Sequence, residues 1–224
     1  MLTNQTLPTA NDILAVWTKQ QKIEYFENLL ASTGRSGVDK IIEFARNSDF
    51  YSAPSSTKYH SNYDGGLLDH VLLVYLTLVR YANVMTEMQG RHFVMPDANS
   101  LIISALLHDI CKTGFYKKVQ KYRKNTAGMW ETYYGYEIED LFPLGHGEKS
   151  VIMLQQIGLD LTVDEMIAIR YHMGSWDGGM LAGDVKLSYQ DALNRCPLMI
   201  LLQAADSNST LLLEENVTPE AVSA

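Results

Sequence analysis

The decapeptide ALLHDICKTG, residues 105–114, places a histidine, an aspartate and a lysine at the end of an apolar run that is typical of a buried helix. An isolated charge in an apolar interior costs several kcal/mol unless it is paired or bound to a metal. His108 and Asp109 therefore need partners, and the residues next to them in the sequence supply none. We expect the rest of the chain to provide them.

Length and composition indicate a soluble globular protein. The 224 residues suffice for one large domain, or for one domain with a small helical extension. The formal net charge of -8 argues against non-specific coating of nucleic acid, because such binding needs a broad cationic surface. Cys111 and Cys196 make no disulfide framework and no export signal is apparent, so we expect a cytoplasmic protein.

The most apolar long stretch, residues 67–85, is a poor membrane span. It carries Asp69, His70 and Arg80, which are costly in a bilayer. We predict a buried helix there and no membrane partner.

Most of the chain repeats apolar residues at three- and four-residue steps, the period of a helix. The stretch 117–140 differs: Tyr, Trp, Val and Thr surround the turn-like sequence NTAG, which predicts a β-hairpin. The predicted fold class is all-α, a helical bundle with a small β-hairpin insertion. Helices are expected within 11–32, 37–48, 66–88, 101–111, 143–160, 162–179 and 189–215.

Candidate metal ligands occur one per helical segment. Separate helices of a bundle produce this distribution when each contributes a side chain to a shared core site. Taken singly, each candidate has a metal-free explanation, such as a hydrogen-bonded core histidine or, for Asp206, a helix N-cap. Taken together, ionisable residues in three separate apolar runs favour a metal site. The candidates are His70, His108, Asp109, His146, His172 and Asp206.

Five segments carry a family resemblance: GGLLDH (65–70), ALLHDICK (105–112), PLGHGEKS (143–150), RYHMGSWD (170–177) and LLQAADSNS (201–209). In this order they resemble the H…HD…H…H…D pattern of the HD superfamily of metal-dependent phosphohydrolases, over roughly residues 50–212. The chain is most similar to the HD domain of bacterial 3′–5′ exoribonucleases. Two positions depart from many relatives: Cys111 stands where Gly is common, and Tyr171 where a second His is common.

The resemblance implies an all-α fold with a mono- or binuclear metal site. The implied organisation is a helical extension over 1–50 packed on the core, an HD domain over 51–215 and a flexible tail over 216–224. The matching positions assign His70, His108, Asp109 and Asp206 to the basic site. His146 and His172 match the additional ligands of binuclear members.

This ligand set suits phosphate chemistry. Two divalent ions held by four neutral imidazoles and two carboxylates keep a formal charge of about +2, which attracts a phosphate oxyanion. Such ions lower the pKa of coordinated water and stabilise charge on phosphoryl oxygens. Asp109, next to His108, is the expected bridge and catalytic residue. The mixed nitrogen and oxygen ligands favour one or two ions of Mn, Fe, Co, Ni or Zn over Mg.

Lys112 lies three and four residues beyond Asp109 and His108, so on a continuing helix it shares their face. We predict that it is catalytic and binds a substrate phosphate. The alternative is an exposed lysine at the end of the helix.

A basic cluster with interleaved aromatic residues follows at 117–124. Lys117, Lys118 and Lys121 are candidates for binding a nucleic-acid backbone, and a solvated hairpin face is the alternative. His60 is a candidate for the mouth of the pocket, with an ordinary loop histidine as the alternative.

The expected function is metal-dependent hydrolysis of a phosphodiester or nucleotide, with a nucleotide or single-stranded nucleic acid as substrate. Two alternatives belong to other classes. Some HD proteins are di-iron oxygenases with the same ligand pattern, and a non-catalytic nucleotide-binding module is conceivable. The complete ligand set disfavours the binding module, which would be free to lose ligands.

Overall fold

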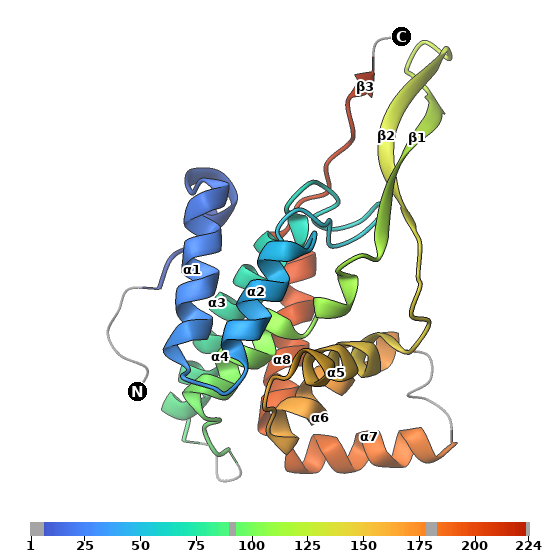
Figure 1. The fold of residues 1–224 in the computed structure, drawn as a ribbon. Helices are drawn as coiled ribbons and strands as arrows, with labels where there is room; N and C mark the ends of the chain where they lie inside the picture. The colour runs from blue at the N-terminus through green and yellow to red at the C-terminus, as the bar shows by residue number, and fades with distance from the viewer. Residues whose placement is uncertain (1–6, 90–92, 178–182, 223–224) are drawn as a thin grey trace.

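The computed structural model describes residues 7–89, 93–177 and 183–222. Within these ranges the chain forms a helical body from which a β-hairpin projects (Figure 1). The α-helices are α1 (Lys19–Ser32), α2 (Val38–Asn47), α3 (Gly66–Glu87), α4 (Ala98–Leu107), α5 (His146–Ile157), α6 (Val163–Tyr171), α7 (Gly183–Arg195) and α8 (Pro197–Asn208). The strands are β1 (Tyr116–Lys124), β2 (Trp130–Ile138) and β3 (Ala221–Val222). The predicted all-α fold with a hairpin is confirmed.

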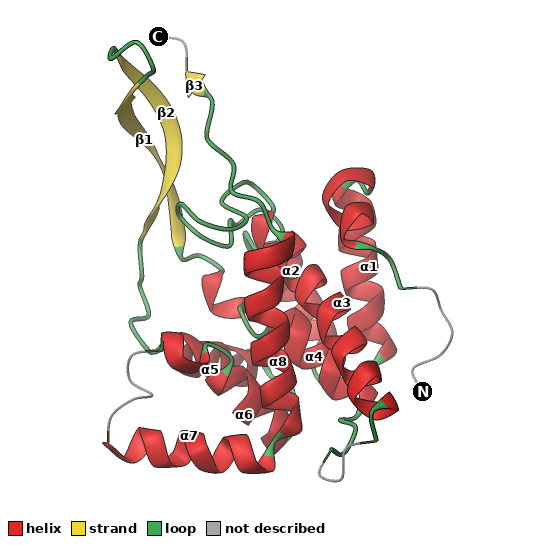
Figure 2. Cartoon of the chain, turned by 180° about the vertical axis from the view of Figure 1, so that it is seen from behind, coloured by secondary structure: helices red, strands yellow, loops and turns green. Residues whose placement is uncertain are grey.

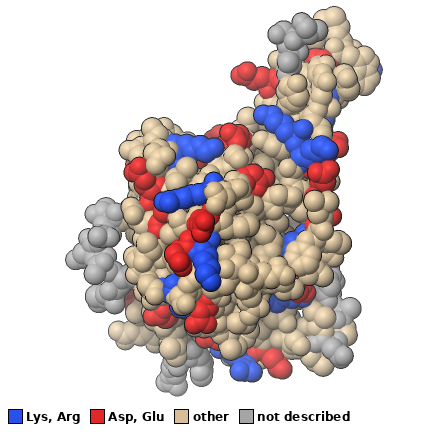
Figure 3. All heavy atoms as spheres, viewed as in Figure 1, with Lys and Arg blue, Asp and Glu red and all other residues tan. Residues whose placement is uncertain are grey.

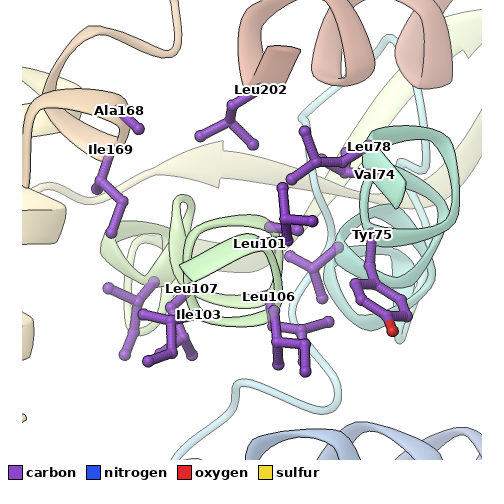
Figure 4. Close-up of a cluster of buried hydrophobic side chains, with 14 of the residues drawn as sticks. Val74, Tyr75, Leu78, Leu101, Ile103, Leu106, Leu107, Ala168, Ile169 and Leu202 are labelled. Carbon is purple, nitrogen blue, oxygen red and sulfur yellow. The ribbon is translucent and has the colours of Figure 1, made fainter. Parts of the chain in front are cut away.

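Helix α3 is the centre of the body. Its first fourteen residues, Gly66–Val79, are all buried, because the sequence is apolar on every face. It packs against α4 and α8, and α6 lies against α4 and α8 in turn. Figure 4 shows the resulting core, in which the labelled apolar side chains come from α3, α4, α6 and α8.

Helix α3 is also long and apolar enough to cross a membrane by composition. However, 78% of its most apolar window is buried inside the protein. This burial fits the core helix of a globular domain, as the charged residues in its sequence predict.

Buried ion pairs fasten the N-terminal helices to the body. Lys22 Nζ on α1 lies 2.6 Å from Asp69 Oδ1 on α3. Arg35 makes two hydrogen bonds of 2.9 Å with Glu165 of α6, whose side chain is fully buried. Removing one member of such a pair leaves an unpaired buried charge, so these contacts hold α1 and the turn that follows it on the core.

Four predicted helices are interrupted. The pattern over 11–32 divides into a π-helical turn, Asp12–Val16, and α1, which starts with a capping box between Thr18 and Gln21. The helix predicted through Cys111 ends at Leu107 and gives way to a 3-10 turn, Ile110–Lys112. This interruption at Leu107 shapes the candidate site. The helix predicted over 162–179 divides into α6 and a 3-10 turn, Gly174–Trp176, and its residues 178–179 lie outside the described residues. The helix predicted over 189–215 divides into the end of α7, α8 and the π-helical turn Ser209–Leu213.

The hairpin pairs β1 with β2 from Tyr116↔Ile138 to Lys124↔Trp130. Its loop is closed by Asn125, whose Oδ1 accepts hydrogen bonds from the amides of Ala127 and Met129. β3 pairs with the other edge of β2, and Arg123 of β1 donates to Pro219 O, so residues 219–222 run beside the hairpin (Figure 2). This paired stretch belongs to the predicted tail over 216–224, of which 223–224 lie outside the described residues.

Candidate metal centre

The six predicted ligands come from five parts of the body. His70 lies in the first turns of α3, His146 starts α5, and Asp206 lies in α8. His108 and His172 are the residues at which α4 and α6 end. Asp109, two residues after the end of α4, has backbone angles φ -107° and ψ 18°, and the chain turns there into the site.

Asp109 stands at the centre of this cluster, with each oxygen facing a different pair of histidines. Its Oδ1 lies 2.6 Å from His146 Nε2 and 3.4 Å from His172 Nε2. Its Oδ2 lies 3.2 Å from His70 Nε2 and 3.6 Å from His108 Nε2. The carboxylate can therefore serve two ions at once.

Asp206 completes the half of the site that contains His70 and His108. Its Oδ1 lies 3.4 Å from His70 Nε2 and 3.9 Å from His108 Nε2. The predicted alternative of a helix N-cap is wrong, because Asp206 lies inside α8.

The four histidines share one orientation. In each, Nδ1 faces a group outside the ligand cluster while Nε2 faces inward. The Nδ1 atoms of His108 and His172 lie 2.8 and 2.7 Å from the carbonyl oxygens of Ala105 and Ile169. The Nδ1 atoms of His70 and His146 lie 2.7 Å from Glu214 Oε1 and 3.2 Å from Cys111 Sγ. Such contacts fix the tautomer of a metal-binding histidine.

These residues fit a divalent metal. His172 Nε2 is buried and makes no hydrogen bond, whereas nearly all buried polar atoms in proteins have a partner. Among the six predicted ligands, donor atoms within 4.8 Å of one another form three groups that share members. They are His70–His108–Asp109, His108–His172–Asp206 and Asp109–His146–His172. These groups can hold one or two divalent ions.

Burial and the neighbouring carboxylates together set the charge state of the histidines. Burial holds the pKa of His108 well below its ordinary value and also lowers the pKa of His146. Both imidazoles are therefore neutral and can donate an electron pair to a metal ion. Burial acts in the same direction on His70, but the carboxylates of Glu214 and Asp109 outweigh it and raise its pKa to about 10. A cation bound at His70 Nε2 would take the place of that proton.

Lys112 is buried in the site rather than exposed. Its side chain is 10% exposed, and its Nζ lies 2.6 Å from Asp109 Oδ2 and donates to Ser55 Oγ at 3.0 Å. Burial by itself would lower the pKa of Lys112, but Asp109 outweighs it and raises the pKa. In turn, burial would raise the pKa of Asp109, but Lys112 and the neighbouring histidines hold it well below its ordinary value. The alternative of an exposed lysine at a helix end is wrong.

The remaining predicted substrate-binding residues lie in two places: His60 lies beside the ligands, and the three lysines lie on β1. The ring of His60 lies 5.4 Å from that of His70, which places it beside the ligand cluster. Lys117 and Lys121 pair with Glu139 and Glu137, at 3.2 and 3.6 Å.

Lys118 points to the opposite face of β1 from Lys117 and Lys121, because side chains alternate along a strand, and its Nζ lies over the ring of Tyr134. On the face of the molecule in Figure 3, basic and acidic side chains are interspersed, so no broad cationic surface forms there.

The two positions that depart from many relatives have clear environments. Cys111 contacts His146, and burial raises the pKa of its thiol to about 12, so it is a neutral neighbour of the site. The ring of Tyr171 packs against Tyr189, at 5.6 Å between centroids, and against Arg170.

Two residues near the ligands were missed by the sequence prediction. Glu214 contacts His70 Nδ1, and Ser61 Oγ donates to Glu214 Oε2 at 2.6 Å. An acidic residue after the apolar run LLL at 211–213 was the one available signal for Glu214. No pattern in the loop distinguishes Ser61 from its neighbouring serines.

Comparison with curated proteins finds a relative of this chain. Dihydroneopterin 2′,3′-cyclic phosphate phosphodiesterase of Methanocaldococcus jannaschii is 28% identical over 141 residues, which are 58% of this chain and 51% of that protein. The chain thus spans about half the length of this relative. No solved structure matches significantly. The greater likeness to 3′–5′ exoribonucleases is not shown by these matches and stays a prediction.

The family model of the HD domain matches residues 67–211. This range contains all six predicted ligands, and the structure brings all six together around Asp109. The order of the motifs along the chain and their meeting in space agree with the match. The chain belongs to the HD domain family.

Proposed function

We propose that this protein is a metal-dependent phosphohydrolase that cleaves a phosphodiester in a nucleotide-sized substrate. The observation that carries the proposal is the position of Asp109, whose two oxygens face two separate pairs of histidines. The relative named as a cyclic phosphate phosphodiesterase supports the same reaction class.

The predicted ligands fall into two sets around Asp109, and Lys112 has a separate role. His70, His108 and Asp206 would hold one ion and His146 and His172 a second, with Asp109 shared. Bound divalent ions supply Lewis-acid stabilisation of phosphoryl oxygens and lower the pKa of water. Lys112 keeps its positive charge beside Asp109, where it can bind and orient a phosphate oxygen.

A nucleotide-sized substrate is favoured over an oligomer. Lys117 and Lys121 are paired with acidic residues, and Lys118 lies on the other face of β1, so these three lysines form no continuous track for a backbone. Exonuclease-like cleavage of single-stranded nucleic acid is the second candidate, supported by the basic and aromatic content of β1. A cytoplasmic location is proposed because Cys111 and Cys196 are both free.

A substrate panel tests this choice. We expect a 2′,3′-cyclic nucleotide to be hydrolysed with a higher kcat/KM than a single-stranded RNA oligomer or a nucleoside monophosphate. Joint replacement of Lys117, Lys118 and Lys121 by Ala should leave the cyclic substrate's kcat/KM within about twofold, since surface charges contribute little.

Two results of the panel would contradict the proposal. Faster cleavage of RNA with a steep salt dependence that the triple variant flattens would establish the oligomer as substrate. Preferred cleavage of the monophosphate would overturn the phosphodiester assignment.

Replacement of Lys112 by Met keeps the length of the side chain but removes its charge. We expect kcat/KM to fall about tenfold to a thousandfold, at about 1.4 kcal/mol per factor of ten, because a phosphate contact is lost. The variant Lys186→Met, at an exposed position of α7, is the matched control. Metal content should stay unchanged in both variants, and an unchanged rate in the Lys112 variant would remove it from the catalytic residues.

A further inference from the structure

Glu214 makes a contact with His70 that differs from those of the other histidines. Its side chain is fully buried, and its Oε1 lies 2.7 Å from His70 Nδ1. His108 and His172 rely on main-chain carbonyls of their own helices, and His146 on a thiol. Among the described residues, His70 is the ligand candidate whose Nδ1 faces a carboxylate.

Glu214 is itself held from two sides. The π-helical turn Ser209–Leu213 follows α8, and the amide of Glu214 donates to Ser209 O at 3.1 Å. Its second oxygen, Oε2, accepts from Ser61 Oγ at 2.6 Å. Both carboxylate oxygens are therefore committed, which fixes the plane of the group and the direction of its contact with His70.

Residues 214–217, which we name the C-terminal strap, are fastened to the loop before α3. Glu215 O accepts from the amide of Ser61 at 2.9 Å. Asn62 makes two hydrogen bonds with the main chain of Val217, at 2.7 and 2.9 Å. Neither the strap nor Ser61 lies in the range matched by the HD family model, residues 67–211.

We infer that Glu214 is a positioning residue for the metal centre: it accepts a hydrogen bond from His70 Nδ1 and so holds His70 Nε2 toward Asp109 and Asp206. The inference rests on the proposed metal-dependent function. A carboxylate that accepts a hydrogen bond from the non-ligating nitrogen of a metal-binding histidine fixes the ring and raises the basicity of the ligand nitrogen. Loss of such a carboxylate typically lowers metal affinity about 10–100-fold.

An ion held by His60, His70 and Glu214 is a different possibility, because their donor atoms lie within 4.8 Å of one another. The distance of 2.7 Å between His70 Nδ1 and Glu214 Oε1 favours the hydrogen bond. Two ligand atoms that bind one ion at right angles, each about 2.0–2.2 Å from the ion, lie about 3 Å from each other. The observed separation is shorter than this.

The test compares Mn²⁺ affinity in the full-length protein and its variants by titration calorimetry. Glu214→Ala should weaken binding about 10–100-fold. Glu214→Gln, which keeps an oxygen that can accept from His70 Nδ1, should recover a large part of that loss. Glu215→Ala is the matched control: its side chain is exposed and its carbonyl remains in place, so its affinity should equal that of the unaltered protein.

A second measurement separates positioning from general damage to the fold. Nitrogen NMR spectra of the histidine side chains, recorded without added metal, should show the hydrogen-bonded Nδ1 proton of His70 in the unaltered protein and its loss in Glu214→Ala. If Glu214→Ala fails to fold, Ser61→Ala provides the same comparison, because it removes the hydroxyl that holds Glu214 Oε2. We expect a smaller loss of affinity from it than from Glu214→Ala.

The outcomes distinguish this inference from the proposed function. An unaltered protein that binds no Mn²⁺ would remove the metal-dependent function itself. Binding in the unaltered protein with equal affinity in Glu214→Ala would overturn only the role of Glu214. A stoichiometry lower by one ion in Glu214→Ala, with the remaining affinity unchanged, would also overturn it in favour of a site on His60, His70 and Glu214.

Discussion

Asp109→Asn is expected to abolish activity and to remove the bound metal. The exchange keeps the shape of the side chain but takes away the negative charge that would serve both ions. It also leaves the buried ammonium of Lys112 without its ion-pair partner. Without the charge of Asp109 the transition state loses several kcal/mol of stabilisation. Because about 1.4 kcal/mol corresponds to a factor of ten, kcat should fall by at least about a thousandfold.

Elemental analysis of the purified variant and its rate on the cyclic substrate check this expectation. Asp97→Asn, at the N-cap of α4, is the matched control. Asp97 caps the start of α4 with hydrogen bonds to the amides of Asn99 and Ser100, and asparagine caps equally well. A variant Asp109→Asn that retained metal and measurable turnover would contradict the shared role of Asp109.

Removal of the metal is the second change with a large expected effect. A chelator should reduce activity to background, and Mn²⁺, Ni²⁺ or Fe²⁺ should restore it. Metal at a hundred times its Kd should stabilise the fold by about 2.7 kcal/mol. For a chain of this length that corresponds to a rise in Tm of about 5–11 °C, measured by calorimetry with and without metal.

The same experiment decides between the classes of enzyme. A protein purified without metal, and with no gain in Tm from any of the three ions, would exclude a metal centre. Bound iron with turnover that requires oxygen would identify an oxygenase in place of a hydrolase. Turnover of a phosphodiester without oxygen supports the proposed function.

The sequence predicted the fold because its periodicities are strong. Helix α3 is apolar on all faces, and the hairpin combines β-branched and aromatic residues around a turn. The ligands were predictable for a related reason: His70, the pair His108–Asp109 and Asp206 interrupt apolar runs, where an ionisable residue needs a partner. The structure supplies these partners from distant segments.

Three features of the site escaped the sequence pattern for physical reasons. The end of α4 at Leu107 depends on tertiary contacts that turn Asp109 into the site, and the apolar period continues past it. The burial of Lys112 depends on Ser55, far away in the sequence. The contact of Glu214 with His70 also joins distant segments, and period-based reasoning does not detect such pairs.

Among the residues that the structure describes, the order of strands β1-β2-β3 leaves β1 at an edge of the sheet, with no strand paired along its other side. Exposed edge strands can recruit a strand from another molecule and start aggregation, and lysines on an edge strand oppose this. We therefore expect Lys117, Lys118 and Lys124 to oppose self-association of the projecting hairpin. A variant that loses these charges becomes more prone to aggregate, so light scattering belongs beside any rate measured on it.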